Sequence, residues 1–385
     1  MFESMSIESL QEYWWIIISI LGAALVFLMF VQGGQTLIYT LGKTEPERTL
    51  IVNSLGRKWE FTFTTLVTFG GAFFASFPLF YSTSFGGAYW VWMTILFCFI
   101  VQAVSFEFRS KPRNIFGAKT FETFLFINGA LGTILIGTAV GTFFTGANFS
   151  VNKMRLTETL SSVTISRWEH PWHGLEAVLN VQNVLLGLTV FFLARTLALL
   201  YFMNNIGNDQ IYARCRKQLA FNAIPFLIFF LAFAGMLLTG KGFAVTPRTG
   251  SVYMESFKYL HNLLNMPVVL FIFVIGVLLV LFGIAHSLIR ISSKGIWFAG
   301  PGTFLTVFAL FLIAGLNNTA YYPSQYDLQS SLTIHNSSSS HYTLTVMGYV
   351  SLMVPFVILY IIYAWRSINK TKLMDAEMNE ETHIY

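Results

Sequence analysis

The sequence predicts an all-α polytopic membrane protein with nine transmembrane helices, and three observations indicate this class. Hydrophobic residues make up 55% of the 385 residues and charged residues only 11%, whereas soluble domains carry about 25% charged residues. Apolar runs long enough to cross a bilayer as a helix, about 20 residues, recur along the chain. Strands of a membrane barrel would instead show alternating segments of about 10 residues. The chain 1–385 is therefore expected to form a single helical membrane domain.

Nine apolar runs define the predicted spans in chain order. They cover residues 14–38, 61–81, 88–106, 120–144, 175–203, 219–239, 262–289, 296–316 and 343–365. The first starts next to Tyr13-Trp14-Trp15, an aromatic cluster typical of the membrane interface. Residues 367–385 form an acidic tail. Because residues 1–11 contain no Lys or Arg, no cleavable signal peptide is expected.

The distribution of Lys and Arg predicts the orientation. Sixteen of these residues lie in the tail and in the loops after odd-numbered spans, against six in the alternate loops. Loops rich in Lys and Arg remain in the cytoplasm, so the N-terminus is expected outside and the C-terminus in the cytoplasm. The net charge of +5 then reflects topology, and no nucleic-acid partner is expected.

Two uncharged amides lie near the inner end of the first span, in Gln32-Gly33-Gly34-Gln35. Gln32 and Gln35 are three residues apart and share a helix face. An amide exposed to lipid without a partner is costly, so both are expected to face protein or a wet cavity. The simplest interpretation is hydrogen bonding between helices.

A polar stripe is predicted on the second span, where Glu60, Thr64, Thr68, Gly71 and Ala75 fall on one helical face. The two small residues would allow close helix approach, and the threonines would extend a polar track inward from Glu60. Two interpretations of Glu60 stay open. It is either a first-turn acid favoured by the helix macrodipole or a proton-conducting carboxylate, because acids within membranes mark proton relays.

A second charged group, Glu107 with Arg109 and Lys111, closes the third span. Glu107 and Arg109 are two residues apart, so they do not face each other on a helix and each is expected to pair elsewhere. The simplest interpretation is a structural charge cluster at the membrane interface. Arg195, within the fifth span, needs a partner that another subunit could supply.

The sequence offers no convincing haem or metal ligands. Only His286 approaches the interior of a span, and a buried axial ligand is what haem requires. His170 and His173 lie in an external loop without further ligands. Cys98 and Cys215 suggest neither a disulfide nor a metal site.

A set of motifs extends from the first span to the ninth. It comprises Trp59-Glu60, the run Gly70-Gly71-Ala72-Phe73-Phe74-Ala75-Ser76-Phe77-Pro78, Phe106-Glu107-Phe108-Arg109-Ser110-Lys111, Ser331-Leu332-Thr333 and Trp365-Arg366. In this combination the chain resembles subunit II of the cytochrome bd quinol oxidases. The resemblance implies two four-helix bundles plus one additional helix, in the cytoplasmic (inner) membrane of a bacterium.

The resemblance also implies partners and cofactors. Subunit II carries no haem, and haem b558, haem b595 and haem d lie in subunit I, which also oxidises the quinol, a menaquinol or ubiquinol. Subunit II packs against subunit I and contributes a proton path from the cytoplasm to the site of oxygen reduction. A structural quinone, membrane lipid and small single-helix accessory subunits are further expected partners.

The implied proton path begins at Trp59 and Glu60, which match a Trp-Asp pair of the family, and it includes Gln32, Gln35, Thr64 and Thr68. Two departures matter. Gln32-Gly33-Gly34-Gln35 stands where the family has Asp-Gly-Phe-Asp, and glutamine cannot hold a proton as a carboxyl does. Phe61-Thr62-Phe63 replaces the usual Gly-Asn-Gln/Glu. Glu60 is then the remaining titratable group at the entrance.

Two other hypotheses stay open at this point. A stand-alone secondary transporter would use Glu60 and Glu107 as its acids near the midplane, although no pair of broken helices in the two halves points to one. A purely structural scaffold for the haem subunit would need no proton path at all.

Overall fold

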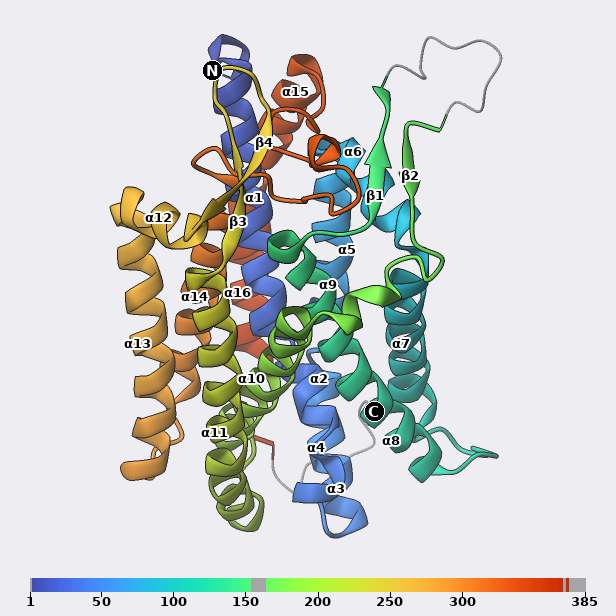
Figure 1. Ribbon diagram of the computed structural model, residues 1–385. Coiled ribbons are helices and arrows are strands. Elements are labelled where there is room, and N and C mark those ends of the chain that lie inside the picture. The colour runs from blue at the N-terminus through green and yellow to red at the C-terminus, as the bar shows by residue number, and fades with distance from the viewer. Residues whose placement is uncertain (1, 154–163, 370–371, 374–385) are drawn as a thin grey trace.

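The computed structural model describes residues 2–153, 164–369 and 372–373, and long helices running side by side dominate it (Figure 1). Within these residues, eight helices are long and apolar enough to cross a membrane. They are α1 with α2 (Ile7–Leu28 and Phe30–Gln35), α7 (Tyr89–Phe108), α8 to α9 (Ala118–Thr145), α10 (Val181–Asn205), α11 (Asp209–Thr239), α13 (Pro267–Ile289), α14 (Ile296–Gly315) and α15 with α16 (His341–Ser351 and Val354–Ile368). The all-α membrane class is confirmed.

The predicted span 61–81 is helical but does not belong to this set. It forms α5 (Trp59–Ser76) and the short α6 (Pro78–Tyr81), which Phe77 separates. Glu60 and the threonines lower the hydropathy of α5, and length and composition identify eight spans among the described residues where nine were predicted. The arrangement of two four-helix bundles plus one helix stays a prediction.

Several helix boundaries differ from the predicted ones for local reasons. The fifth span starts at Val181 because the Asn180 side chain caps it by accepting from the backbone N–H groups of residues 182 and 183. The seventh starts at Pro267, which separates it from α12 (Lys258–Asn265). Asn208 caps α11 in the same way and extends the sixth span at its N-terminal end.

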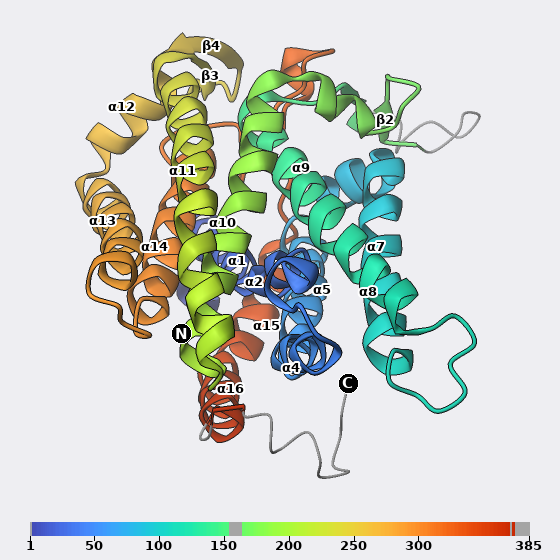
Figure 2. The same cartoon turned by 90° about the horizontal axis from the view of Figure 1, so that it is seen from below.

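The connecting elements gather at the two ends of the molecule (Figure 1). Figure 2 shows the same helices from below. One end holds α3 (Ile38–Leu41) and α4 (Glu45–Gly56), together with the loop 109–117 and the junction of α10 with α11. We call it the basic end, because the loops predicted to be cytoplasmic meet there. The opposite end holds the N-terminus and two antiparallel strand pairs, β1 (Phe149–Val151) with β2 (Ser166–Trp168) and β3 (Lys241–Val245) with β4 (Val252–Ser256).

The remaining elements are short. They are the 3-10 helices η1 (Phe2–Ser4), η5 (Leu175–Leu179) and η6 (Leu328–Ser330), and the π-helices η2 (Ser82–Gly87) and η3 (Asn128–Gly132). The η3 segment joins α8 (Ala118–Ile127) to α9 (Thr133–Thr145), so the fourth span contains a π-helical turn at its middle.

Two large apolar clusters fill most of the interior among the described residues. Toward the opposite end, Trp15 packs against Phe73 and Tyr321 and donates to the carbonyl of Phe311 at 3.0 Å. Toward the basic end, Phe30 lies 4.5 Å from Tyr201, ring centroid to centroid. The segment α2 contributes Phe30 and Val31 to the second cluster and lies next to α10 and η3.

Candidate functional site

Four amide side chains form a buried cluster in the interior. Gln32 and Gln35 of α2 donate to the Oε1 atom of Gln102 on α7 at 2.8 and 2.6 Å. Asn128, the first residue of η3, donates to the same oxygen at 2.6 Å and to Gln35 Oε1 at 2.8 Å. All four side chains are at most 1% exposed. The two glutamines therefore bond between helices, as the simplest interpretation of the sequence predicted.

Glycines bring the backbones around this amide cluster into contact. A Cβ atom on Gly33 would lie 2.1 Å from the backbone of Ala194 on α10. A Cβ atom on Gly129, within η3, would lie 2.3 Å from the carbonyl oxygen of Gln32. Only glycine permits these approaches. The π-helical turn then places Asn128 on the side that meets the glutamines, and such turns often occur at functional sites.

The amide cluster is polar but not titratable. Gln32 Oε1, Gln102 Nε2 and Asn128 Oδ1 have no hydrogen-bond partner among the described residues. Amides can accept and donate to water but cannot store a proton. The cluster can therefore order a hydrogen-bonded chain without holding a charge.

The predicted polar stripe on α5 lies on the outside of the chain. Glu60, Thr64 and Thr68 are all exposed. Each threonine hydroxyl donates 2.7 Å to the carbonyl oxygen four residues earlier, which leaves the hydroxyl oxygen free to accept. A Cβ atom added to Gly71, on the same face, would meet no atom within 4 Å. The close helix approach predicted at Gly71 is absent within the described part of this chain.

Trp59 lies between the stripe and the amide cluster. Its ring stacks on Phe106 with centroids 6.0 Å apart and an interplanar angle of 15°. Gln102 is one helical turn from Phe106 on α7, so the stack borders the cluster. The indole Nε1 is buried without a hydrogen-bond partner among the described residues. The residues predicted to form one path thus divide into an inner cluster and an outer stripe with Trp59 at the boundary.

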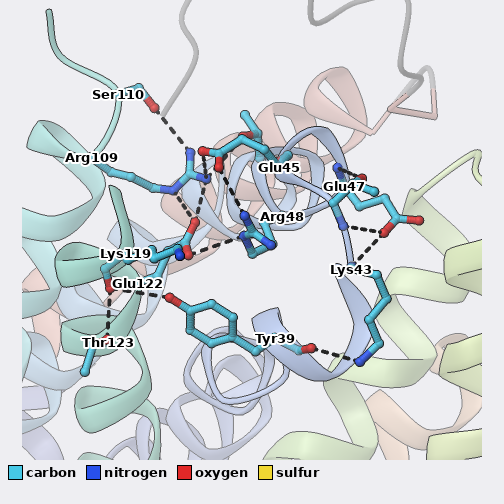
Figure 3. Close-up of polar contacts among 12 residues, drawn as sticks. Tyr39, Lys43, Glu45, Glu47, Arg48, Arg109, Ser110, Lys119, Glu122 and Thr123 are labelled. Atoms are coloured by element: carbon cyan, nitrogen blue, oxygen red, sulfur yellow. Dashed lines mark hydrogen bonds and ion pairs between the residues drawn. The ribbon is translucent and has the colours of Figure 1, made fainter. Parts of the chain in front are cut away.

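Arg109 joins a buried ion pair at the basic end (Figure 3). Its Nη2 lies 2.7 Å from Glu122 Oε1 on α8, and both side chains are almost fully buried. Arg48 of α4 approaches the other Glu122 oxygen at 3.5 Å and pairs with Glu45 at 3.0 Å. Burial and the nearby Glu122 carboxylate raise the pKa of Tyr39 to about 12, so this phenol remains protonated.

Glu107 and Lys111 belong to a different environment. They form an i,i+4 pair at 2.9 Å with side chains 58% and 55% exposed. The predicted cluster of Glu107, Arg109 and Lys111 therefore separates into a solvent-facing pair and a buried arginine. Arg195 finds its partners within the chain, since it donates to Asn222 Oδ1 at 2.6 Å and Thr36 Oγ1 at 2.9 Å.

Sequence reasoning missed three members of these groups: Gln102, Asn128 and Glu122. Each is a polar residue within a predicted span, and an acid or amide in an apolar run is itself a signal of function or pairing. Glu122 was the strongest such signal because it is the acid of the fourth predicted span. The sequence could not show which partner each would meet.

Two of the cavities in the described part of the chain lie apart from these groups. An apolar one is enclosed by α9, α10, α11, α13 and α14, where Phe143, Phe226, Val280 and Thr303 are among its lining residues. A more polar one of about 280 Å³ lies at the opposite end beside Trp168, Glu176 and Tyr322. Within the described residues, no group of three or more His, Cys, Asp or Glu side chains could hold a metal ion.

Comparison with known proteins covers nearly the whole chain. Residues 10–368 match the sequence model of the family described as cytochrome bd terminal oxidase subunit II. The chain is 27% identical to the cytochrome bd-I ubiquinol oxidase subunit 2 of Escherichia coli (strain K12), over 97% of this chain and 98% of that protein. It is 26% identical to the cytochrome bd ubiquinol oxidase subunit 2 of Bacillus subtilis (strain 168), over 91% of this chain and 93% of that protein.

Proposed function

The chain belongs to the cytochrome bd terminal oxidase subunit II family, and we propose that it is a haem-free subunit that packs against subunit I and delivers protons from the cytoplasm. Membership makes it a subunit of a bd-type quinol oxidase, an oxidoreductase. It also favours this function over a stand-alone transporter. In the proposed reaction, two quinols are oxidised outside, and four electrons with four cytoplasmic protons reduce one oxygen molecule to two waters.

The outward-facing stripe on α5 is the observation that carries the proposal. A polar helix face in contact with lipid would leave the Glu60 carboxyl without a partner at a cost of several kcal/mol, and the Thr64 and Thr68 hydroxyl oxygens without a donor. A protein partner with an aqueous seam removes that cost. The stripe is therefore expected to face subunit I, and Gly71 then allows the close approach that the chain itself does not use.

Neighbouring helices extend this surface. Phe61 of α5 contacts Trp365 of α16, and Phe63 contacts Phe99 of α7, so α5 lies between these two helices. None of the residues of α16 is buried, and α7 exposes large side chains such as Phe97 at 66%. Together α5, α7 and α16 present a surface suited to a helical membrane protein.

In the proposed route, Glu60 accepts a proton at the basic end and passes it along the seam. Thr64 and Thr68 donate to their own helix and accept from water in the seam, which orients the chain of hydrogen bonds. The amide cluster with Gln32 and Gln35 lies on the other side of Trp59 from this route. Its amide groups orient the hydrogen bonds of the route from the interior of the subunit. Because amides hold no proton, Glu60 carries the titration among the residues predicted for this path.

The apolar cavity fits a quinone better than a haem. Its lining offers no His, Met or Cys side chain as an axial ligand. Its apolar walls suit an isoprenoid tail, and Thr303 Oγ1, buried without a partner among the described residues, suits a carbonyl oxygen. The haems of subunit I would supply electron transfer from quinol to oxygen. We place only a structural quinone in this subunit, to be checked by solvent extraction of the purified complex and mass spectrometry.

The proposed orientation places the basic end in the cytoplasm, with the N-terminus outside. Thiol labelling of intact cells tests it with single cysteines introduced at Lys111 and at Lys241. We expect a membrane-impermeant reagent to label the second position only.

Purification in mild detergent tests for subunit I and for small accessory subunits, with b- and d-type haem bands expected in a reduced-minus-oxidised spectrum.

Glu60→Gln tests proton delivery in the whole complex. We expect slower oxygen consumption with normal haem content, because the carboxyl that exchanges protons is lost. Glu107→Gln is the matched control, since it removes another exposed acid at the same end. Full activity of Glu60→Gln would contradict the proposed role and leave a structural scaffold as the function.

A further inference from the structure

Lys58, the residue before α5, is buried to an unusual degree. Its side chain is fully inaccessible, whereas lysine is almost never fully buried without a partner. Its Nζ has no hydrogen-bond acceptor among the described residues. Instead it lies 4.4 Å from the ring centroid of Trp365 and 5.9 Å from that of Phe61. An amine enclosed by aromatic rings calls for a physical explanation.

The groups around Lys58 do not neutralise an ammonium. The titratable groups next to it in the chain, on α5 and α16, and on α10 against the Trp365 ring are Arg57, Glu60, Tyr360, Tyr363, Arg366 and Tyr201. Tyr360 and Tyr363 are 69% and 72% exposed. Glu60 and Arg366 point to the exposed surface, and the Tyr201 hydroxyl donates to the carbonyl of Ser54. Burial, assisted by repulsion from Arg57, lowers the pKa of Lys58 to about 7.

Opposing effects therefore balance the two protonation states. Desolvation and the positive end of the α5 macrodipole favour the neutral amine. The face of the Trp365 ring favours the ammonium through a cation–π contact. The adjacent Trp59 Nε1 is also buried without an acceptor among the described residues, so two consecutive residues present polar atoms inside the entrance.

We propose that Lys58 is the interior proton-exchanging group of this subunit's entrance. The neutral amine becomes an ammonium by taking a proton from a hydronium ion when water enters its buried site from the basic end. The ammonium, which has no acceptor in its buried site within the described chain, then returns that proton to the seam that Glu60 borders. This inference rests on the proposed proton delivery and deepens it. It assigns the interior step to a lysine, because the amides of Gln32 and Gln35 cannot perform it.

Two substitutions in the purified complex separate this role from a structural one. Lys58→Arg keeps a cation over the Trp365 ring but cannot deprotonate near neutral pH. Lys58→Met keeps the apolar stem without a charge. We expect both to lower oxygen consumption about tenfold or more, with normal haem content, and to abolish the limb of the pH profile near 7. A structural cation–π role would instead leave Lys58→Arg active with an unchanged profile, which would overturn the proposal.

The Glu60→Gln variant distinguishes failure of this inference from failure of the proposed function. If Glu60→Gln slows turnover while both Lys58 variants are normal, Lys58 is not the exchanging group and proton delivery stands. If all three are normal, both ideas fail.

A direct titration covers the case in which the Lys58 variants do not assemble. Solid-state nitrogen-15 NMR of the wild-type complex, with the lysine Nζ atoms labelled, reports the protonation of the buried amine across the pH range without a reagent that must reach it. We expect the half-point of Lys58 near pH 7. A half-point near about 10.4, as for lysine in model peptides, would overturn the proposal.

Discussion

The amide cluster and the α5 stripe are two polar groups that the sequence joins into one path and the fold separates. The cluster lies inside, where four amides bond to one another across α2, α7 and η3. The stripe lies outside, where Thr64 and Thr68 bond only to their own helix among the described residues. Polar residues in a membrane thus find partners in two ways: from their own chain, or from a chain that is still to bind. The first should govern folding of this subunit and the second its assembly and activity.

The largest difference is expected between glycine substitutions in the amide cluster and in the α5 stripe, in the amount of folded subunit. Gly33→Ala places a Cβ atom 2.1 Å from the α10 backbone, which forces α2 and α10 apart. We expect loss of the folded subunit from membranes, measured by immunoblotting and haem spectra. Gly71→Ala, which meets nothing within 4 Å, should leave the level of this subunit normal. Equal levels of both variants would show that the α2–α10 contact is dispensable.

The two acids at the basic end should rank next. Glu122→Gln leaves Arg109 as a buried charge without its carboxylate, and breaking such a pair costs about 3–5 kcal/mol. Glu107→Gln breaks an exposed pair worth about 0–1 kcal/mol. Thermal unfolding of the purified complex should therefore show a large drop in the midpoint only for Glu122→Gln. Similar midpoints for the two variants would contradict the burial of the Arg109–Glu122 pair.

Loss of the shared acceptor should destabilise the inner region less. Gln102→Leu removes the oxygen that accepts from Gln32, Gln35 and Asn128. A buried donor left unsatisfied lowers the free energy of unfolding by about 1–3 kcal/mol. Thr68→Val on the stripe should hardly change the unfolding midpoint but should weaken activity or subunit I binding. A Thr68→Val variant with wild-type turnover and assembly would argue that the stripe faces lipid.

Lys58, near the boundary of the two regions, should change stability in a way that depends on pH. Its pKa is about 7 in the folded protein and about 10.4 in an unfolded chain. Between these values the unfolded state binds more protons, so stability should rise with pH by up to about 1.4 kcal/mol per unit. This contribution to the free energy of unfolding is lost progressively as pH falls from about 10 toward about 7. Unfolding midpoints across this range should rise more steeply for the wild type than for Lys58→Met.

Most of the helices could be predicted from apolar runs, because the bilayer requires continuous hydrophobic length. The exception is instructive. The run 61–81 was predicted as a span, yet Phe77 divides it into α5 and α6, and neither is among the eight helices of the described chain that are long and apolar enough to cross a membrane. The observed helix starts differ from the predicted ones where a capping residue such as Asn180 or a proline such as Pro267 sets the first residue of the helix.

The candidate sites were less predictable, because helix spacing shows which residues share a face but not what that face meets. Gln32 and Gln35 were expected to bond across helices, and they do. Their partners Gln102 and Asn128 come from segments far away in the chain, and no local pattern connects them. Arg109 was expected to pair away from Glu107, but Glu122 as its partner emerges only when α7 and α8 pack together.

By itself the sequence determined the membrane class, the family and the grouping of basic loops, since these depend on composition, motifs and charge along the chain. Only the tertiary structure decided which polar residues are inside. Gly33 and Gly129 allow three helices to meet around the amides, whereas α5 turns Thr64 and Thr68 outward and Lys58 lies inward against Trp365. The reason is physical: burial and pairing depend on distances between segments remote in sequence, and those distances exist only after the helices have packed.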